Sequence, residues 1–273
     1  MIETVGEMMS HIFIQRAILV GVLISLCAAL LGVSLVLKRY SMIGDGLSHL
    51  GFGVLTVSTA IGVSMPLYLA IFCVAFSAVA LLKLDSNSKL KSDSAIALIS
   101  SSALAIGVAA TSLTTGMNTD VCNFMFGSIL AMSQEDVILS IIVGIIVAIL
   151  FIVYYRKIFL VTFDENFAKA NGLKANRYTY IIAVLTSLII VVGMRMMGVM
   201  LISSIIIFPA LTSMRLFKSF KSVIISSAII SVLSFLIGIY LSYVFNISTG
   251  AMIVIVNLIL FILFSIIEKI IRD

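Results

Sequence analysis

The sequence predicts an all-α protein that crosses a membrane eight or nine times. Hydrophobic residues make up 62% of the 273 residues and charged residues only 11%, whereas soluble domains carry about 25% charged residues. The apolar residues gather in runs long enough to cross about 30 Å of hydrocarbon as helices. None of these runs shows the polar alternation of a membrane β-barrel strand. We therefore expect a single transmembrane domain over residues 1–273.

Nine apolar runs define the expected helices. The segment before the first run, Met1–Gln15, lacks the basic start and the cleavage site of a signal peptide, so we expect the first helix to be retained. The sixth run is short and the seventh is compatible with a broken or re-entrant element, which leaves the count open between eight and nine. The runs are Ala17–Leu37, Met42–Ile61, Met65–Leu82, Ser94–Leu113, Val137–Tyr155, Tyr178–Gly193, Met197–Met214, Val223–Val244 and Thr249–Ile267.

Basic residues separate these runs on one side only. With the N-terminus outside, only Arg16 and Arg195 of the 17 Lys and Arg residues fall on the outer side. The positive-inside rule supports this threading, which places the C-terminus in the cytoplasm. The inner bases are Lys38, Arg39, Lys83, Lys89, Lys91, Arg156, Lys157, Lys169, Lys174, Arg177, Arg215, Lys218, Lys221, Lys269 and Arg272.

Composition and motifs exclude several function classes. The net charge of +5 comes from bases along one membrane face, not from a patch that would bind nucleic acid. The sequence has no GxxxxGK[ST], HExxH or GxSxG motif, so the chain alone cannot hydrolyse ATP and is not expected to be an enzyme. The three cysteines lie in separate segments without CxxC spacing, and we expect no permanently bound cofactor.

An ionisable pair inside the second run marks the candidate site. Asp45 and His49 lie in an apolar stretch, where a charge at the helix centre costs about 2.5–3.5 kcal/mol and therefore indicates function. Residues four apart share one face of a helix. A carboxylate and an imidazole together suit zinc, manganese or ferrous iron, so the pair is a candidate metal-binding site.

The same pair also has a structural interpretation. The Asp45 carboxylate would then fix the tautomer of the His49 imidazole at a helix interface. Gly44, Ser48 and Gly51 recur on an adjacent face at a spacing typical of close helix packing, which would hold the pair against a neighbour. Because zinc usually takes four ligands, water, other helices or a second copy would have to supply the rest.

Residues typical of helix ends predict a short amphipathic helix in the inner loop Arg156–Arg177. Acids precede the helical stretch and a glycine follows it, as is typical of helix ends. The alternative is a solvated connector that only sets topology. The residues that define the segment are Phe163, Asp164, Glu165, Ala168 and Gly172.

Four segments together resemble the permease subunit of zinc, manganese and iron ABC importers. The resemblance covers nearly the whole chain in the expected order. The sequence departs from it after His49, where many relatives carry a proline, and after Pro209, where Ala210-Leu211-Thr212 replaces consecutive alanines; neither departure touches a candidate ligand. The segments are Gly44–His49, Phe126–Leu130, Phe163–Ala168 with Gly172, and Arg195–Leu201 followed by Phe208–Ala210.

The resemblance implies a type II ABC importer-like permease in the bacterial cytoplasmic membrane, embedded in membrane lipid. It implies a homodimer that carries cytoplasmic ATP-binding subunits and receives metal from an extracellular metal-binding protein. Asp45 and His49 would line the translocation path, and the loop at about 156–178 would dock the ATPase. The glycines Gly46 and Gly51–Gly53 favour Zn²⁺ as cargo, with Mn²⁺ or Fe²⁺ as alternatives.

The residues are also compatible with two other function classes. A gradient-driven secondary metal transporter would use the same pair but has no need of an ATPase-docking helix. An intramembrane metalloenzyme would need a general base or nucleophile beside Asp45 and His49, and the sequence shows none there; the second histidine, His11, lies outside the apolar runs.

The topology is testable by cysteine labelling of intact cells. In a variant without the native cysteines, an impermeant reagent should modify a cysteine at position 120 and not one at position 89, because fifteen of the 17 bases then lie inside. Modification at 89 but not at 120 would overturn the orientation.

Overall fold

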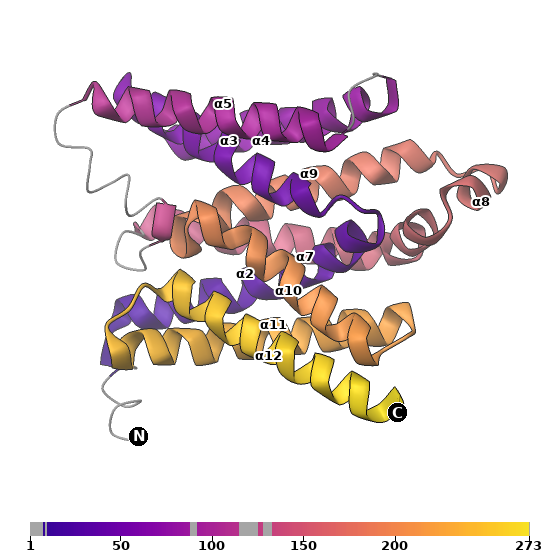
Figure 1. Ribbon diagram of the computed structural model, residues 1–273. Coiled ribbons are helices and arrows are strands. Elements are labelled where there is room, and N and C mark those ends of the chain that lie inside the picture. Colours follow the sequence, from indigo (N-terminus) through magenta and orange to yellow (C-terminus); the bar gives the residue numbers. More distant parts are fainter. Residues whose placement is uncertain (1–7, 9, 88–91, 115–124, 128–132, 273) are drawn as a thin grey trace.

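The computed structural model describes residues 8, 10–87, 92–114, 125–127 and 133–272. Within these residues the chain forms helices that run back and forth along one direction (Figure 1). No strand occurs in them, as an all-α fold requires. The helices are α2 (Ile12–Leu37), α3 (Ser41–Ala60), α4 (Pro66–Asn87), α5 (Ser92–Ser112), α7 (Gln134–Phe163), α8 (Glu165–Ala170), α9 (Ala175–Met197), α10 (Val199–Leu216), α11 (Phe220–Phe245) and α12 (Thr249–Arg272).

Seven helices of the described chain are long and apolar enough to cross a membrane: α2, α4, α5, α7, α9, α11 and α12. Two more, α3 and α10, lie in the same bundle; α3 carries the ionisable pair and several glycines, and α10 is 18 residues long. These nine elements match the nine expected runs. The start of α2 and the end of α12 lie at opposite ends of the bundle (Figure 1), which agrees with an odd number of crossings.

The question of eight or nine helices is decided at Gly198. This residue has φ 89° and ψ 151°, a conformation that a side chain would strain and that ends α9 at Met197. Helix α9 begins at Ala175 and has 23 residues, so the sixth run is long enough to cross. Helix α10 then runs back as a separate helix with Pro209 inside it.

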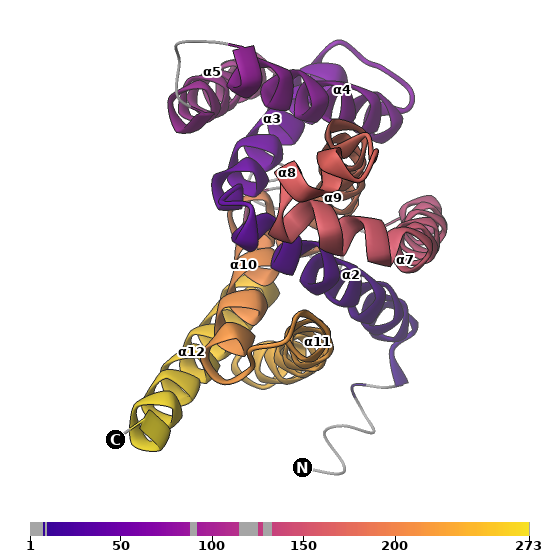
Figure 2. The ribbon, with the colours of Figure 1, turned by 90° about the vertical axis from the view of Figure 1, so that its right-hand side faces the viewer.

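Helices α2 and α9 form the centre of the bundle, and most of their residues are buried. Figure 2 shows α4 and α5 on one side of them and α11 and α12 on the other. Small residues allow these helices to pack closely against the centre. Such packing is usual in a membrane, where burying apolar surface gives helices no hydrophobic driving force to associate. For example, the Ser231 hydroxyl of α11 donates a hydrogen bond to the Ser25 carbonyl of α2 at 2.8 Å. The apolar side chains of α4, such as Phe72 and Phe76, face outward.

Two glycines with positive φ meet at the end of the bundle opposite α8. A Cβ on Gly127 would lie 2.4 Å from the backbone of Met197, and one on Gly198 would lie 2.5 Å from that of Phe126. The Ser248 hydroxyl donates to the Phe126 carbonyl at 3.0 Å. This contact joins two of the four segments on which the family resemblance rests; residues 128–130 of that motif lie outside the described residues.

An ion pair lies at the same end of the bundle. The Arg195 guanidinium, near the end of α9, contacts the Asp136 carboxylate in the first turn of α7 at 2.6 Å. Ser133 and Asp136 also form a reciprocal capping box that starts α7. One of the two outer bases of the predicted topology is thus neutralised by a carboxylate that also caps a helix.

Candidate metal path and coupling loop

Helix α3 brings Asp45 and His49 onto one face, as their spacing predicts. The His49 Nε2 atom lies 3.7 Å from the Asp45 Oδ1 atom, which is longer than a hydrogen bond. The Ser203 hydroxyl of α10 donates to the same Oδ1 atom at 3.4 Å. The His49 side chain is 13% exposed and the Asp45 side chain 40% exposed, so the carboxylate faces the open side of the pair.

The second imidazole nitrogen is an unusual feature of this pair. His49 Nδ1 is buried and has no hydrogen-bond partner among the described residues, although buried polar atoms nearly always have one. The structural interpretation, in which the carboxylate fixes the imidazole tautomer, needs a short contact that the 3.7 Å separation does not provide. The arrangement leaves both side chains able to take a further ligand.

One copy of the chain offers few donors for a metal ion. No group of three or more His, Cys, Asp or Glu side chains gathers in the described part of the chain. The methionines beside Arg195 do not add to the pair, because Met194, Met196 and Met197 are buried in the hydrophobic core. Among the acidic, histidine and cysteine side chains of the described residues, Asp45 and His49 therefore have no third partner for a metal ion.

The residues predicted to pack α3 against a neighbour contact different helices. Gly44 lies beside Ser203 and Ile206 of α10, and Gly51 lies against Met194 of α9. Ser48 is fully buried, and its hydroxyl donates to the Asp45 carbonyl of its own helix at 2.8 Å. All three positions are buried, so they hold α3 against its neighbours close to Asp45 and His49.

The closest helix approach on α3 lies at two other glycines. A Cβ on Gly53 would lie 2.6 Å from the Ala103 carbonyl oxygen of α5, and one on Gly46 would lie 2.5 Å from the Ile96 side chain. The seven-residue spacing keeps both glycines on the same face. The sequence interpretation used Gly46 and Gly51–Gly53 as signs of metal preference, whereas in the structure these residues contact neighbouring helices.

The inner loop folds as its terminal signals predict. Asp164 precedes α8, and its carboxylate accepts a hydrogen bond from the Phe167 backbone amide at 2.8 Å. The helix ends before Gly172, which has φ 76°. The Leu173 amide then donates to the Ala168 carbonyl at 3.0 Å, the pattern of a helix end closed by a left-handed glycine.

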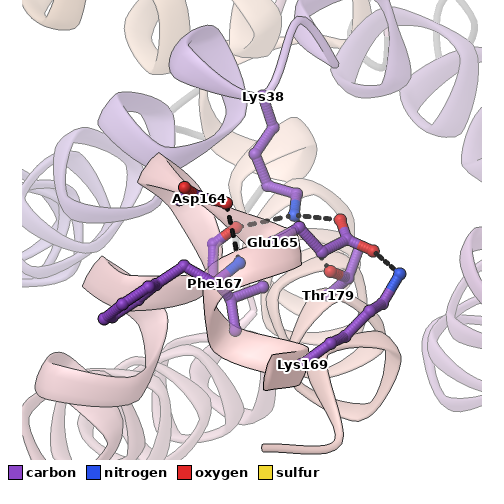
Figure 3. A network of polar contacts seen from close by, with 7 residues as sticks. Lys38, Asp164, Glu165, Phe167, Lys169 and Thr179 are labelled. Carbon is purple, nitrogen blue, oxygen red and sulfur yellow. Dashed lines mark hydrogen bonds and ion pairs between the residues drawn. The ribbon is translucent and has the colours of Figure 1, made fainter. Parts of the chain in front are cut away.

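A buried lysine joins this loop to the start of α3. Lys38, directly after α2, donates to the Glu165 carboxylate at 3.3 Å, to the Thr179 hydroxyl at 3.0 Å and to the Val161 carbonyl at 3.1 Å. Its side chain is only 7% exposed. Lys169 contacts the other oxygen of Glu165 at 2.8 Å but is half exposed. Figure 3 shows the three acceptors converging on the Lys38 ammonium.

The pKa values of Lys38 and Glu165 are both lowered from their ordinary values, for different reasons. Burial lowers the pKa of Lys38, and the nearby Glu165 carboxylate opposes that change. The hydrogen bond from Lys169, together with the charge of Lys38, lowers the pKa of Glu165. A carboxyl group whose pKa is lowered by folding stabilises the fold at pH values above its ordinary pKa. This stabilisation is lost as the pH falls through the pKa of the folded state. The Glu165 carboxylate therefore stabilises the loop at neutral pH, and acidification removes this contribution.

The residues of the loop predicted to dock the ATPase separate into an exposed and a buried group. Phe163 and Phe167 are 57% and 55% exposed, and Figure 3 shows the Phe167 ring pointing away from the Lys38–Glu165 contact. Ala168 is fully buried against Val161 and Ala175. Its side chain shapes the loop from inside, so a contact surface on α8 has to come from the phenyl rings and the exposed polar residues.

The sequence interpretation missed Lys38, Thr179 and Ser203 as members of these sites. Lys38 was counted only among the bases that set topology. Its position directly before the helix with the ionisable pair could have drawn attention to it. No local feature of the sequence, however, indicates that its partner is Glu165, 127 residues further along the chain. The two hydroxyl residues lie in apolar runs, where serine and threonine usually bond within their own helix.

The fold and the site together define a class of protein: a multi-pass helical membrane protein with an aspartate–histidine pair inside the bundle and a structured loop at one end. The sequence matches the ABC 3 transport family over residues 10–268. The chain belongs to this family and is a permease subunit of a metal ABC importer, in which a separate subunit hydrolyses ATP. It is not an enzyme, and this membership decides against the gradient-driven carrier and the metalloenzyme.

Relatives and a solved structure agree over nearly the full length. The chain is 30% identical to the manganese import system permease protein ScaB of Streptococcus gordonii, over 91% of this chain and 89% of that protein. It is 32% identical to a probable iron transport system membrane protein of Haemophilus influenzae, over 96% of both. The structure titled PsaBC from Streptococcus pneumoniae in complex with Fab includes a chain with TM-score 0.87 and 29% identity, over 97% of this chain and 95% of that one.

The role of Lys38 is testable by replacing, one at a time, the two lysines that contact Glu165. Lys38→Met leaves two further acceptors without a donor, and each unmet buried acceptor costs about 1–3 kcal/mol. Lys169→Met removes only an exposed pair, worth about 0–1 kcal/mol. Thermal unfolding of the purified chain, with hydrogen exchange over residues 164–172, should show a clear loss in the first variant and little in the second. Equal behaviour of both variants would contradict the assignment.

Proposed function

We propose that this permease conducts manganese or ferrous iron, with Asp45 and His49 as ligands along the path. The observation that carries the proposal is this pair on one face of a membrane helix, with an exposed carboxylate and an imidazole nitrogen that has no partner among the described residues. A carboxylate with a single imidazole is a donor set that suits these ions. The relatives are named for manganese and iron transport, which supports the choice over zinc.

The preference for zinc loses its basis in the structure. It rested on Gly46 and Gly51–Gly53, and these glycines face Ile96, Met194 and Ala103 on neighbouring helices. In this chain these glycines therefore bear on helix packing, and they offer the ion no side-chain ligand. Zinc remains a competing cargo to be measured, since affinity order alone does not choose among divalent metals.

The site is completed by a second copy of the chain in this proposal. Asp45 is 40% exposed although most of α3 around it is buried. Two protein donors bind a divalent ion weakly, and a homodimer would bring two such pairs to one path. Weak binding from few ligands also suits conduction, because an ion has to leave the site as readily as it enters.

The partners follow from the two ends of the bundle. The end that holds α8 carries most of the bases, so we place it in the cytoplasm with the C-terminus and the ATP-binding subunits. The metal-binding protein would then approach the opposite end, near the Arg195–Asp136 pair and the Gly127–Gly198 contact.

Lys38 offers a direct physical route from the ATPase to the metal. It contacts Glu165 of α8 and lies three residues before Ser41, the first residue of α3. Asp45 follows one turn later. A shift of the docked loop would therefore move the start of α3 and change the surroundings of the metal pair, because the buried ammonium holds both segments to α9 through Thr179.

The metal path is tested by uptake of manganese, iron and zinc into vesicles that contain the complete importer. Asp45→Asn keeps the size of the side chain and can still accept from Ser203, but it removes the charge that offsets ion dehydration. His49→Ala removes the imidazole donor. Both variants should abolish uptake of the transported metal without lowering the amount of inserted protein.

The structural interpretation of the pair predicts a different result for these variants. If Asp45 only held His49 in place, Asp45→Asn would retain uptake and unfold at a lower temperature. Wild-type uptake in both variants would show that residues other than Asp45 and His49 form the metal path. A zinc rate far above the manganese and iron rates in the wild-type importer would contradict the proposed cargo.

The docking surface is tested at Phe167. Phe163 already packs against Phe159 and Phe220, whereas Phe167 leaves its ring exposed on α8. Phe167→Ser should weaken co-purification with the ATP-binding subunit and leave the unfolding temperature of the permease unchanged. Phe217→Ser, which changes an exposed phenyl ring outside this loop, is the matched control. Equal recovery of the ATPase with both variants would exclude α8 as the docking site.

A further inference from the structure

A groove lies between α7 and α9 near the end of the bundle that holds α8. Its volume of about 630 Å³ lies within the range of sites that take small-molecule ligands. The two helices supply all of its walls, which are mostly apolar. The wall residues are Leu150 and Tyr154 of α7 and Tyr180, Ile181, Val184 and Leu185 of α9.

The mouth of this groove is basic. Lys174 and Arg177 line it at the start of α9, together with Asn176, and all three residues are exposed. Lys157 lies nearby, because its ammonium is 5.9 Å from the centre of the Tyr154 ring and 5.4 Å from that of Tyr178. Three cations therefore gather where the apolar walls end.

No carboxylate lines the groove among the described residues. The nearby acid Glu165 is already paired with Lys38 and Lys169. The cations at the mouth thus keep an excess positive charge that favours an anion. A small free anion would leave the walls empty, since apolar side chains offer it no hydrogen bonds.

The groove lies where the membrane meets the cytoplasm in the predicted topology. Tyrosines are enriched at this depth, and α7 exposes apolar side chains such as Ile149, Ile152 and Val153 towards the surroundings. Figure 2 shows α7 at an edge of the bundle, away from α3 and α10. The metal pair and the proposed contact with a second copy are therefore on another side of the molecule.

We infer that this groove binds an anionic phospholipid, with an acyl chain between α7 and α9 and the phosphate at Lys174 and Arg177. Basic pockets between membrane helices on the cytoplasmic side recognise such headgroups. Lys174 directly precedes α9 and lies two residues after Gly172, which follows α8. A lipid bound here holds the start of α9, which also carries Thr179 of the Lys38 contact.

The test measures lipid binding by the purified permease in complex with its ATPase. The complex is titrated with phosphatidylglycerol in a phosphatidylcholine background, and bound lipid is followed by mass spectrometry of the intact complex. Replacing both cations, Lys174→Gln with Arg177→Gln, should weaken phosphatidylglycerol binding about 30-fold, from two charges near the membrane surface. Lys218→Gln with Lys221→Gln removes the same charge from exposed positions outside the groove and should leave binding unchanged.

A second variant separates the lipid from a free anion. Val184→Trp fills the apolar wall and keeps both cations, so it should also weaken lipid binding. The inference is overturned if both charge variants bind phosphatidylglycerol equally, or if inorganic phosphate displaces the lipid while Val184→Trp has no effect. Cross-linking of two copies through cysteines at position 184 would instead make the groove a protein interface. These readouts do not depend on which metal is transported.

Discussion

Lys38 lies where α2 ends and where α7, α8 and α9 meet, and its buried ammonium needs the acceptors that these helices offer. A lysine taken out of water is costly unless hydrogen bonds and an opposite charge replace the lost hydration. Here a carboxylate, a hydroxyl and a backbone carbonyl from three elements do so. The same side chain lies three residues before α3, so one contact links the geometry of the loop to that of the Asp45–His49 pair.

Close backbone contacts at glycines fix the rest of the arrangement. Gly46 and Gly53 bring α5 against α3, and Gly127 and Gly198 bring a loop against the break between α9 and α10. In lipid, helices gain little from burying apolar surface, so packing depends on close approach and on polar contacts. Together these contacts hold the ionisable pair at a defined place in a bundle that is otherwise apolar.

The proposed metal site balances the free-energy cost of ion dehydration against the need to release the ion. A complete set of protein ligands would hold a divalent ion tightly, while none would leave its dehydration without compensation. Asp45 and His49 supply one charge and one neutral donor, and Ser203 contacts the carboxylate. The exposure of Asp45 leaves room for water or for ligands of a second copy, which is the arrangement expected of a path and not of a storage site.

The sequence by itself determined the helical class, the nine runs, the Asp45–His49 pair and the short capped helix at Glu165–Ala170. These features depend on local periodicity and on signals within a few residues of each other. Only the tertiary structure decided that Gly198 separates two full helices, that Ala168 is buried, and that Gly53 faces α5. It also decided that Lys38 meets Glu165, because partners 127 residues apart come together only when the helices pack. In an apolar sequence, local patterns do not distinguish the residues that contact another helix from those that do not. The packing of the bundle determines which residues make these contacts.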